Sequence, residues 1–254
     1  MADDAGVSLK GRVSAEEWQA RVDCAALYRL VALHGWDDLI FTHISMRVPG
    51  PDHHFLINPY GMLFEEITAS SLVKVDLDGN IVAPTPYYIN PAGFTIHSAI
   101  HAAREDALCA IHLHTDAGVG VSAQAEGLLP LTQNALIVLP RLAYHGYEGI
   151  ALNLDERERL VADLGDKQLM LLRNHGTLAV GTNAADAFVA MFFFERACAQ
   201  QVAALSAGPG KVLVAPDAAQ EEVRGQVAGA RMVAGLAWPG LLRKLDRHLP
   251  GYAA

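Results

Sequence analysis

The sequence predicts a layered α/β protein, because short apolar runs of strand length alternate with segments of helical periodicity. Strands and helices that alternate in this way pack as layers around a shared core. The chain has 254 residues, of which 52% are hydrophobic, so it can bury a core of domain size. Gly, Pro, Asn and Asp cluster between the runs, which predicts turns there. We expect one domain with a helical extension at its C-terminal end.

The N-terminal third is predicted to form a helix followed by a meander of strands. Residues 1–13 are expected to be a flexible tail. Ser14-Ala15-Glu16-Glu17 has the pattern of a capping box, and apolar residues recur at helical spacing from Trp18 until Gly35. Alternating apolar runs then predict strands at residues 39–48, 54–58 and 72–75.

The remaining two thirds are predicted to alternate helices with strands. Helical patterns cover residues 94–104, 117–125, 156–164, 183–207 and 223–236. Strand-length apolar runs cover residues 108–112, 169–172 and 177–180. A Gly-Pro-Gly break at 208–210 divides the main domain, residues 14–207, from a helical C-terminal extension, residues 208–254.

Charge and composition exclude several classes of function. The formal net charge is -9, whereas binding of nucleic acid phosphates needs clustered Lys and Arg. Cys24, Cys109 and Cys198 are far apart and are expected to be free thiols in a reducing compartment. The acidic N-terminus has no signal-like apolar segment, and no apolar stretch reaches the roughly 20 residues that span a bilayer. We therefore expect a cytoplasmic protein that binds neither nucleic acid nor membrane.

The apolar run Ala110-Ile111-His112-Leu113-His114-Thr115 carries two histidines at positions i and i+2. On a strand, these side chains lie on the same face. His175 follows a second apolar run and could complete a three-histidine metal site from a neighbouring strand. Three imidazoles leave a coordination position open, as catalytic metal sites do. A pair of histidines at this spacing can equally be structural, and spacing alone does not assign the third ligand.

Motifs distributed over residues 15–207 make the chain resemble the class II aldolase/adducin head domain family. They include Thr42-His43-Ile44-Ser45-Met46-Arg47, Phe55-Leu56-Ile57-Asn58-Pro59-Tyr60-Gly61, Leu72-Val73-Lys74-Val75-Asp76-Leu77-Asp78-Gly79, His97-Ser98-Ala99-Ile100-His101, Ile111-His112-Leu113-His114-Thr115 and Leu172-Arg173-Asn174-His175-Gly176. The resemblance implies a three-layer αβα fold with a central, largely antiparallel sheet. It also implies that His112, His114 and His175 bind a divalent metal, usually zinc, with iron or manganese as alternatives. Members of the family commonly form homotetramers.

Two departures from the aldolases bear on the reaction. Gly93 stands where the resemblance implies an acid/base glutamate, and glycine has no group that can take a proton. The segments that would hold a sugar phosphate are also different, and Pro91 lacks a backbone donor. We therefore expect a small, non-phosphorylated carbonyl or carboxylate substrate and a lyase reaction of aldolase or decarboxylase type, with the catalytic residue unassigned.

Two other functions are compatible with the same motifs. One is an adducin-like binding or assembly module without catalysis, in which the metal is structural or vestigial. The other is a non-haem iron oxygenase that acts on an aromatic acid, because three histidines with open positions also suit iron. A basic tail, which adducins use for actin and membranes, does not follow the motifs in this sequence.

Further residues are candidates for the pocket or for support of the ligands. His97, Asn58 and Tyr144 are assigned to this group, and His97 could equally be a packing residue. Asp116 is expected to cap the helix that follows the histidine pair. Glu65 and Glu66 could replace the missing base, although a solvated loop is the preferred interpretation. Tyr144, His145 and Tyr147 could line a pocket or a subunit seam.

Overall fold

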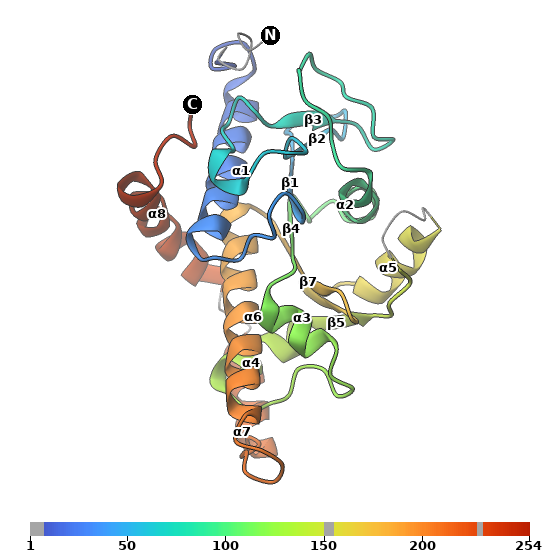
Figure 1. Ribbon diagram of the computed structural model, residues 1–254, viewed down its shortest axis with the longest axis vertical. Helices are drawn as coiled ribbons and strands as arrows, with labels where there is room; N and C mark the ends of the chain where they lie inside the picture. The colour runs from blue at the N-terminus through green and yellow to red at the C-terminus, as the bar shows by residue number, and fades with distance from the viewer. Residues whose placement is uncertain (1–7, 150–154, 228–230) are drawn as a thin grey trace.

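The computed structural model describes residues 8–149, 155–227 and 231–254 (Figure 1). Within these residues, seven strands form one sheet in the order β3-β2-β1-β4-β7-β6-β5. All neighbouring strands are antiparallel except β5 and β6, which are parallel. The strands are β1 (His43–Arg47), β2 (Phe55–Ile57), β3 (Val73–Val75), β4 (Cys109–Leu113), β5 (Leu142–His145), β6 (Leu169–Leu172) and β7 (Gly176–Gly181).

Helices cover both faces of the sheet, which gives three layers. One layer contains α1, α3, α4, α6 and α8, which share the main hydrophobic core; α7 packs against α4. The other layer contains α2 and α5, which pack against each other and over a second apolar cluster (Figure 1). The helices are α1 (Ala15–Leu33), α2 (Pro91–Ala103), α3 (Asp116–Ser122), α4 (Gln133–Val138), α5 (Glu156–Leu164), α6 (Ala184–Leu205), α7 (Asp217–Val227) and α8 (Arg231–His248), with short 3₁₀ turns at Phe64–Glu66 and Leu139–Arg141. The αβα fold with a largely antiparallel sheet is therefore confirmed.

Side-chain caps start the two long helices of the main core. The Ser14 hydroxyl accepts the Glu17 N–H at α1, and the Asn183 side chain accepts the Asp186 N–H at α6. Helix α6 has 22 residues and, by length and composition alone, is apolar enough to cross a membrane. It packs against β7, α3, α4 and α8, with about half of its side chains buried, which is the arrangement of a core helix.

The C-terminal segment folds back onto the main core. Helix α8 packs on α1 and α6 and buries Leu245. The chain end then pairs with the loop before β3, where Ala69 N–H donates to the Tyr252 carbonyl at 2.8 Å. Of the predicted tail, residues 1–7 lie outside the described residues, and the Leu9 N–H donates to Ser70 Oγ at 3.1 Å.

Several predicted boundaries were wrong for local reasons. The strand expected at 39–48 starts only at His43, because Leu39 and Thr42 have left-handed φ values of 52° and 62°. Thr115, and not Asp116, caps α3 by accepting the Gly118 N–H. Helix α4 and strand β5 were not predicted. The helix expected at 223–236 falls partly in α7 and partly in α8, and residues 228–230 between them lie outside the described residues.

Candidate metal centre

The three predicted histidines come together where β4 ends and β7 begins. His112 is on β4, and His114 is the first residue after this strand. His175 lies in the tight turn between β6 and β7, where Asn174 adopts a left-handed φ of 54° that asparagine tolerates well. Because β4 pairs antiparallel with β7, this turn lies beside the end of β4. The three ring centroids are 4.7 to 4.8 Å apart.

The hydrogen bonds of two of these rings leave their Nε2 atoms free to bind an ion. His112 Nδ1 lies 3.0 Å from the Thr177 carbonyl, and His114 Nδ1 lies 3.0 Å from Asp38 Oδ2. Because both oxygens only accept, each Nδ1 donates its proton to them, and each Nε2 faces the other ring. Burial keeps the His112 ring neutral, so His112 Nε2 presents a lone pair. The two Nε2 atoms are 3.0 Å apart, close enough to share a proton or to bind one cation together.

The spacing of the three imidazoles suits a divalent cation. Tetrahedral zinc with Zn–N bonds of about 2.0–2.1 Å separates its nitrogen ligands by roughly 3.3 Å. One nitrogen from each of the three histidines lies within 4.8 Å of the others. The residues therefore fit a three-histidine metal site.

Burial keeps these imidazoles in the form that binds metals. Burial, followed by the neighbouring His175 and His114, lowers the pKa of His112 well below 6.5. Burial, followed by His114 and His145, lowers the pKa of His175 to about 4. Both rings are consequently neutral near pH 7 and can donate a lone pair.

A cavity of about 440 Å³ opens beside the three histidines. Its wall contains aromatic, apolar, amide and hydroxyl groups, and none of the described residues that line it is Lys or Arg. The lining residues are Phe41, Thr42, His43, Tyr60, Asn90, Gly93, Ile96, His112, His114, Tyr147, Gly149, Asn174 and His175.

His43 occupies the space beside Gly93 in this wall. His43 on β1 is directly opposite His112 on β4, so the two side chains lie on one face of the sheet. A Cβ added to Gly93 would lie 2.3 Å from His43 Nδ1 and 2.4 Å from the ring carbons Cγ and Cε1. The glycine therefore admits the imidazole ring, and sequence reasoning about the missing glutamate did not identify this neighbour.

Two buried polar atoms of the wall have no partner among the described residues. They are Thr42 Oγ1 and His43 Nε2, in side chains that are 1% and 4% exposed. Thr42 is β-branched and has a left-handed φ of 62°. This backbone conformation is strained for a β-branched residue, and such strain is typical of functional sites. Burial and, to a lesser extent, His114 lower the pKa of His43 to about 3, so its ring is neutral.

The predicted supporting residues do not line this cavity. His97 Nδ1 is 2.6 Å from Ser45 Oγ, on the α2 side of the sheet. The Asn58 side chain accepts the Tyr28 hydroxyl at 2.9 Å. The Tyr144 hydroxyl accepts the Leu128 N–H at 3.3 Å. A role for these three residues in supporting the metal site stays a prediction.

Other residues that were weighed have clear places in the structure. Glu65 and Glu66 are exposed, and Glu66 accepts the Leu63 N–H at 2.8 Å. Both carboxylates therefore belong to a solvated turn. Asp38 and Thr177, which accept hydrogen bonds from His114 and His112, were not predicted, because each is far in the sequence from the histidine that it contacts. Tyr147 lies in the cavity wall, with its ring centroid 6.5 Å from that of His175.

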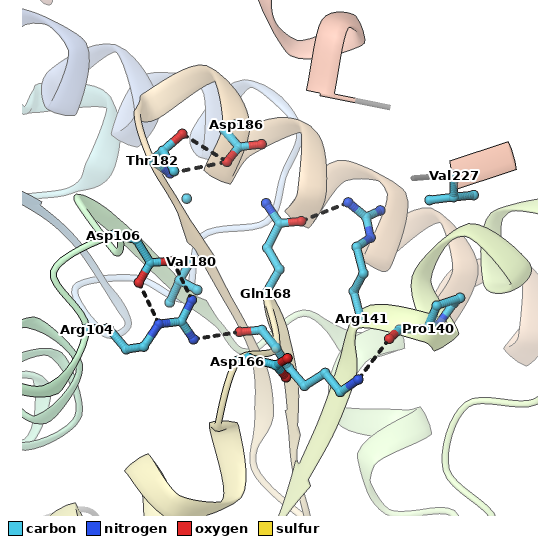
Figure 2. A pocket seen from close by; sticks show the side chains of 12 residues that line it. Arg104, Asp106, Pro140, Arg141, Asp166, Gln168, Val180, Thr182, Asp186 and Val227 are labelled. Atoms are coloured by element: carbon cyan, nitrogen blue, oxygen red, sulfur yellow. Dashed lines mark hydrogen bonds and ion pairs between the residues drawn. The ribbon is translucent and has the colours of Figure 1, made fainter. Parts of the chain in front are cut away.

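A second cavity, of about 340 Å³, lies at the opposite end of β7, where Gly181 lines it. Figure 2 shows that its polar side chains bind one another. Arg104 Nε donates to Asp106 Oδ1 at 2.7 Å, and Arg141 Nη1 donates to Gln168 Oε1 at 2.8 Å. These contacts connect the segments next to α2, β5 and β6. We therefore place the candidate functional site at the three histidines.

Comparisons with known proteins agree with this geometry. Residues 22–202 match the family described as class II aldolase and adducin N-terminal domain. A Caulobacter vibrioides protein provisionally named a class 2 aldolase is 73% identical over 256 residues, which cover 100% of both chains. Alpha-adducin of Rattus norvegicus is 47% identical over 193 residues, which cover 75% of this chain and 26% of the adducin.

Solved structures resemble the whole chain. The crystal structure of an aldolase II superfamily protein from Pseudomonas syringae has a TM-score of 0.93 and 53% identity, and the match covers 98% of this chain and 100% of that one. L-fuculose 1-phosphate aldolase from Glaciozyma antarctica PI12 has a TM-score of 0.81 and 25% identity, with 96% and 95% covered.

Proposed function

Because this chain belongs to the class II aldolase and adducin N-terminal domain family, we propose that it is a metal-dependent lyase of aldolase or decarboxylase type. The observation that carries the proposal is the convergence of His112, His114 and His175 around one point. His112 and His114 turn their Nε2 atoms toward each other at 3.0 Å, while each Nδ1 is bonded to an acceptor oxygen.

The three histidines would hold the divalent ion, with zinc as the proposed metal and iron or manganese as alternatives. A bound ion of this kind supplies a Lewis acid that polarises a carbonyl or carboxylate oxygen. Asp38 and the Thr177 carbonyl orient two of the imidazoles by accepting their Nδ1 protons. From the cavity wall, Thr42 Oγ1 and His43 Nε2 would offer hydrogen-bonding atoms to a compound bound beside the ion.

The cavity favours a small substrate without a phosphate group. A phosphate dianion is usually bound by Arg, Lys or a series of backbone donors. The described lining of this cavity has no Arg or Lys. The relative from Glaciozyma antarctica is named for a sugar phosphate, so we propose that this chain differs from it in substrate class.

Metal analysis and ligand screening test the proposal together. Protein purified without added metal should contain about one divalent ion per chain, and His112→Ala should lose it. In thermal-shift assays, small hydroxycarbonyl or carboxylate compounds should stabilise the loaded wild-type protein more than sugar phosphates do. Absence of metal from the wild-type protein would contradict the enzyme, and strong stabilisation by a sugar phosphate would contradict the substrate class.

An adducin-like binding module is the second candidate, favoured by the 47% identity to alpha-adducin over 75% of this chain. This chain spans only about a quarter of that adducin, so the activity of the whole adducin is not transferred. A module without catalysis should keep its assembly properties in His112→Ala. Consumption of oxygen by an iron-loaded protein with an aromatic acid would instead support the oxygenase alternative.

We further propose a homotetramer in the cytoplasm. Sedimentation velocity of the purified chain tests the assembly, because a tetramer has four times the mass of the chain. A monomer at micromolar concentration would contradict it.

A further inference from the structure

Glu195 is a buried carboxyl group in the apolar helix α6. Its residue surface is only 3% exposed. Oε1 accepts the Thr177 hydroxyl at 2.6 Å, and Oε2 accepts the Thr115 hydroxyl in a short hydrogen bond. A carboxyl group in a core is costly unless it is well hydrogen-bonded, so its presence here needs a reason beyond packing.

Both hydroxyl partners are directly connected to metal-binding histidines. Thr115 is the residue after His114, and its hydroxyl also accepts the Gly118 N–H at 2.9 Å. The Thr177 carbonyl accepts the Nδ1 proton of His112 at 3.0 Å. Glu195 therefore connects the end of β4 with the start of β7 at the level of the candidate metal centre.

The surrounding packing leaves little freedom for this connection. A Cβ added to Gly118 would lie 2.9 Å from Thr115 Oγ1, 2.9 Å from Thr177 Cγ2 and 3.2 Å from Glu195 Oε1. Helix α6 is seated equally closely on the other end of β7, where a Cβ on Gly181 would lie 2.4 Å from the Ala187 nitrogen. A movement of Glu195 would thus be transmitted to both threonines.

We propose that Glu195 is a positioning residue of the metal centre, which holds Thr115 and Thr177 so that His114 and His112 keep the geometry of ligands. An apolar side chain of similar size would attach α6 to the sheet without the desolvation cost. Two oriented hydroxyl bonds instead fix the angular positions of the segments that carry the ligands. The inference depends on the proposed function only in that the three histidines bind a divalent ion.

The test separates metal affinity from fold stability. The affinity of wild-type protein and Glu195→Gln for Zn²⁺ is measured by competition with a chromophoric chelator, and Co²⁺-loaded protein is examined by visible absorption. We expect Glu195→Gln to bind Zn²⁺ more weakly, by at most the roughly 10- to 100-fold that loss of a group bonded directly to a metal ligand costs. We also expect a changed Co²⁺ spectrum, with a melting temperature of the metal-free protein that does not fall.

Glu17→Gln is the matched control. Glu17 is also a buried glutamate with two partners, but it pairs with Arg21 and Lys74 away from the histidines. The Glu17→Gln substitution should lower the melting temperature and leave Zn²⁺ affinity unchanged. Thr177→Val, which removes one hydroxyl, should reproduce the loss of affinity of Glu195→Gln, and Thr177→Ser should restore wild-type affinity.

Two outcomes overturn the inference. If Glu195→Gln and Thr177→Val both bind Zn²⁺ as tightly as the wild-type protein, Glu195 does not position the ligands, and the proposed function is unaffected. If the wild-type protein binds no ion, both the inference and the proposed function fail.

Discussion

Replacing Gly93 by alanine should push His43 out of its place in the cavity wall. Gly93 lies in the first turn of α2, and its φ is not in the left-handed region, so alanine itself fits the backbone. The added Cβ would lie 2.3 Å from His43 Nδ1. Non-bonded atoms prefer about 3.5–4.0 Å, so the ring would have to move by more than about 1 Å.

The expected loss of stability follows from the two sides of this contact. His43 belongs to β1, which pairs with β2 and β4, so its backbone cannot retreat easily. Overpacking of this kind costs about 1–3 kcal/mol. Without the clash, Gly→Ala in a helix gains up to about 1 kcal/mol. We expect Gly93→Ala to lower the free energy of unfolding by about 2 kcal/mol, and the melting temperature by roughly 4–8 °C.

A double-mutant cycle measures the contact directly. In the His43→Ala background, Gly93→Ala should be neutral or stabilising, which gives a coupling energy of about 2–3 kcal/mol. Gly225→Ala is the matched control, because Gly225 also lies in a helix and a Cβ there meets nothing within 4 Å. Thermal and urea unfolding of the metal-free variants provide the data. Equal costs of Gly93→Ala in both backgrounds would refute the assigned contact.

Three further predictions concern acid, the ligand turn and the sheet. Burial lowers the pKa of His43 and of His101 from 6.5 to about 3. Because the unfolded chain then binds more protons, the free energy of unfolding should be highest above pH 6.5 and fall below it, by up to about 1.4 kcal/mol per pH unit for each ring. Urea unfolding from pH 7 to pH 5 tests this, and an unchanged midpoint contradicts it. Gly176→Ala would place a Cβ 2.3 Å from the Leu113 carbonyl oxygen and should lower the free energy of unfolding by about 1–3 kcal/mol. It should also weaken metal binding, measured by chelator competition, and wild-type affinity would show that the turn adapts. Tyr28→Phe removes a hydroxyl that hydrogen-bonds to the backbone at Ile44 and Asn58. It should lower the free energy of unfolding by about 1–3 kcal/mol, measured by calorimetry, and an unchanged melting temperature would show that these bonds add no net stability.

Local patterns in the sequence predicted most of the elements that carry the site. The spacing of His112 and His114 in an apolar run predicted a strand with both rings on one face, and β4 has that form up to Leu113. The third ligand could not come from spacing, because His175 is brought to the site by pairing between β4 and β7. Family resemblance supplied it, and the ring geometry agrees with that assignment.

The cavity wall was predicted less well, for reasons that lie in tertiary packing. The strand pattern at 39–48 did not show the left-handed Thr42, which breaks the strand directly before His43. The absence of a carboxylate at Gly93 was visible in the sequence, whereas the imidazole that fills the space was not. That contact joins β1 to α2, segments about fifty residues apart, and no local rule relates them.

The candidate metal ligands and the facing wall of the cavity come from different parts of this fold. The ligands and their supports come from β4, β7, α6 and the loop that carries Asp38. The facing wall comes from β1 and the first turn of α2, where Gly93 and His43 are fitted to each other. Under the proposed function, we expect substitutions in the wall to change which oxygen-bearing compound fits while the three histidines keep their metal affinity. We therefore expect variants of His43 to alter ligand preference in thermal-shift assays, whereas variants of Glu195 alter Zn²⁺ affinity in chelator competition.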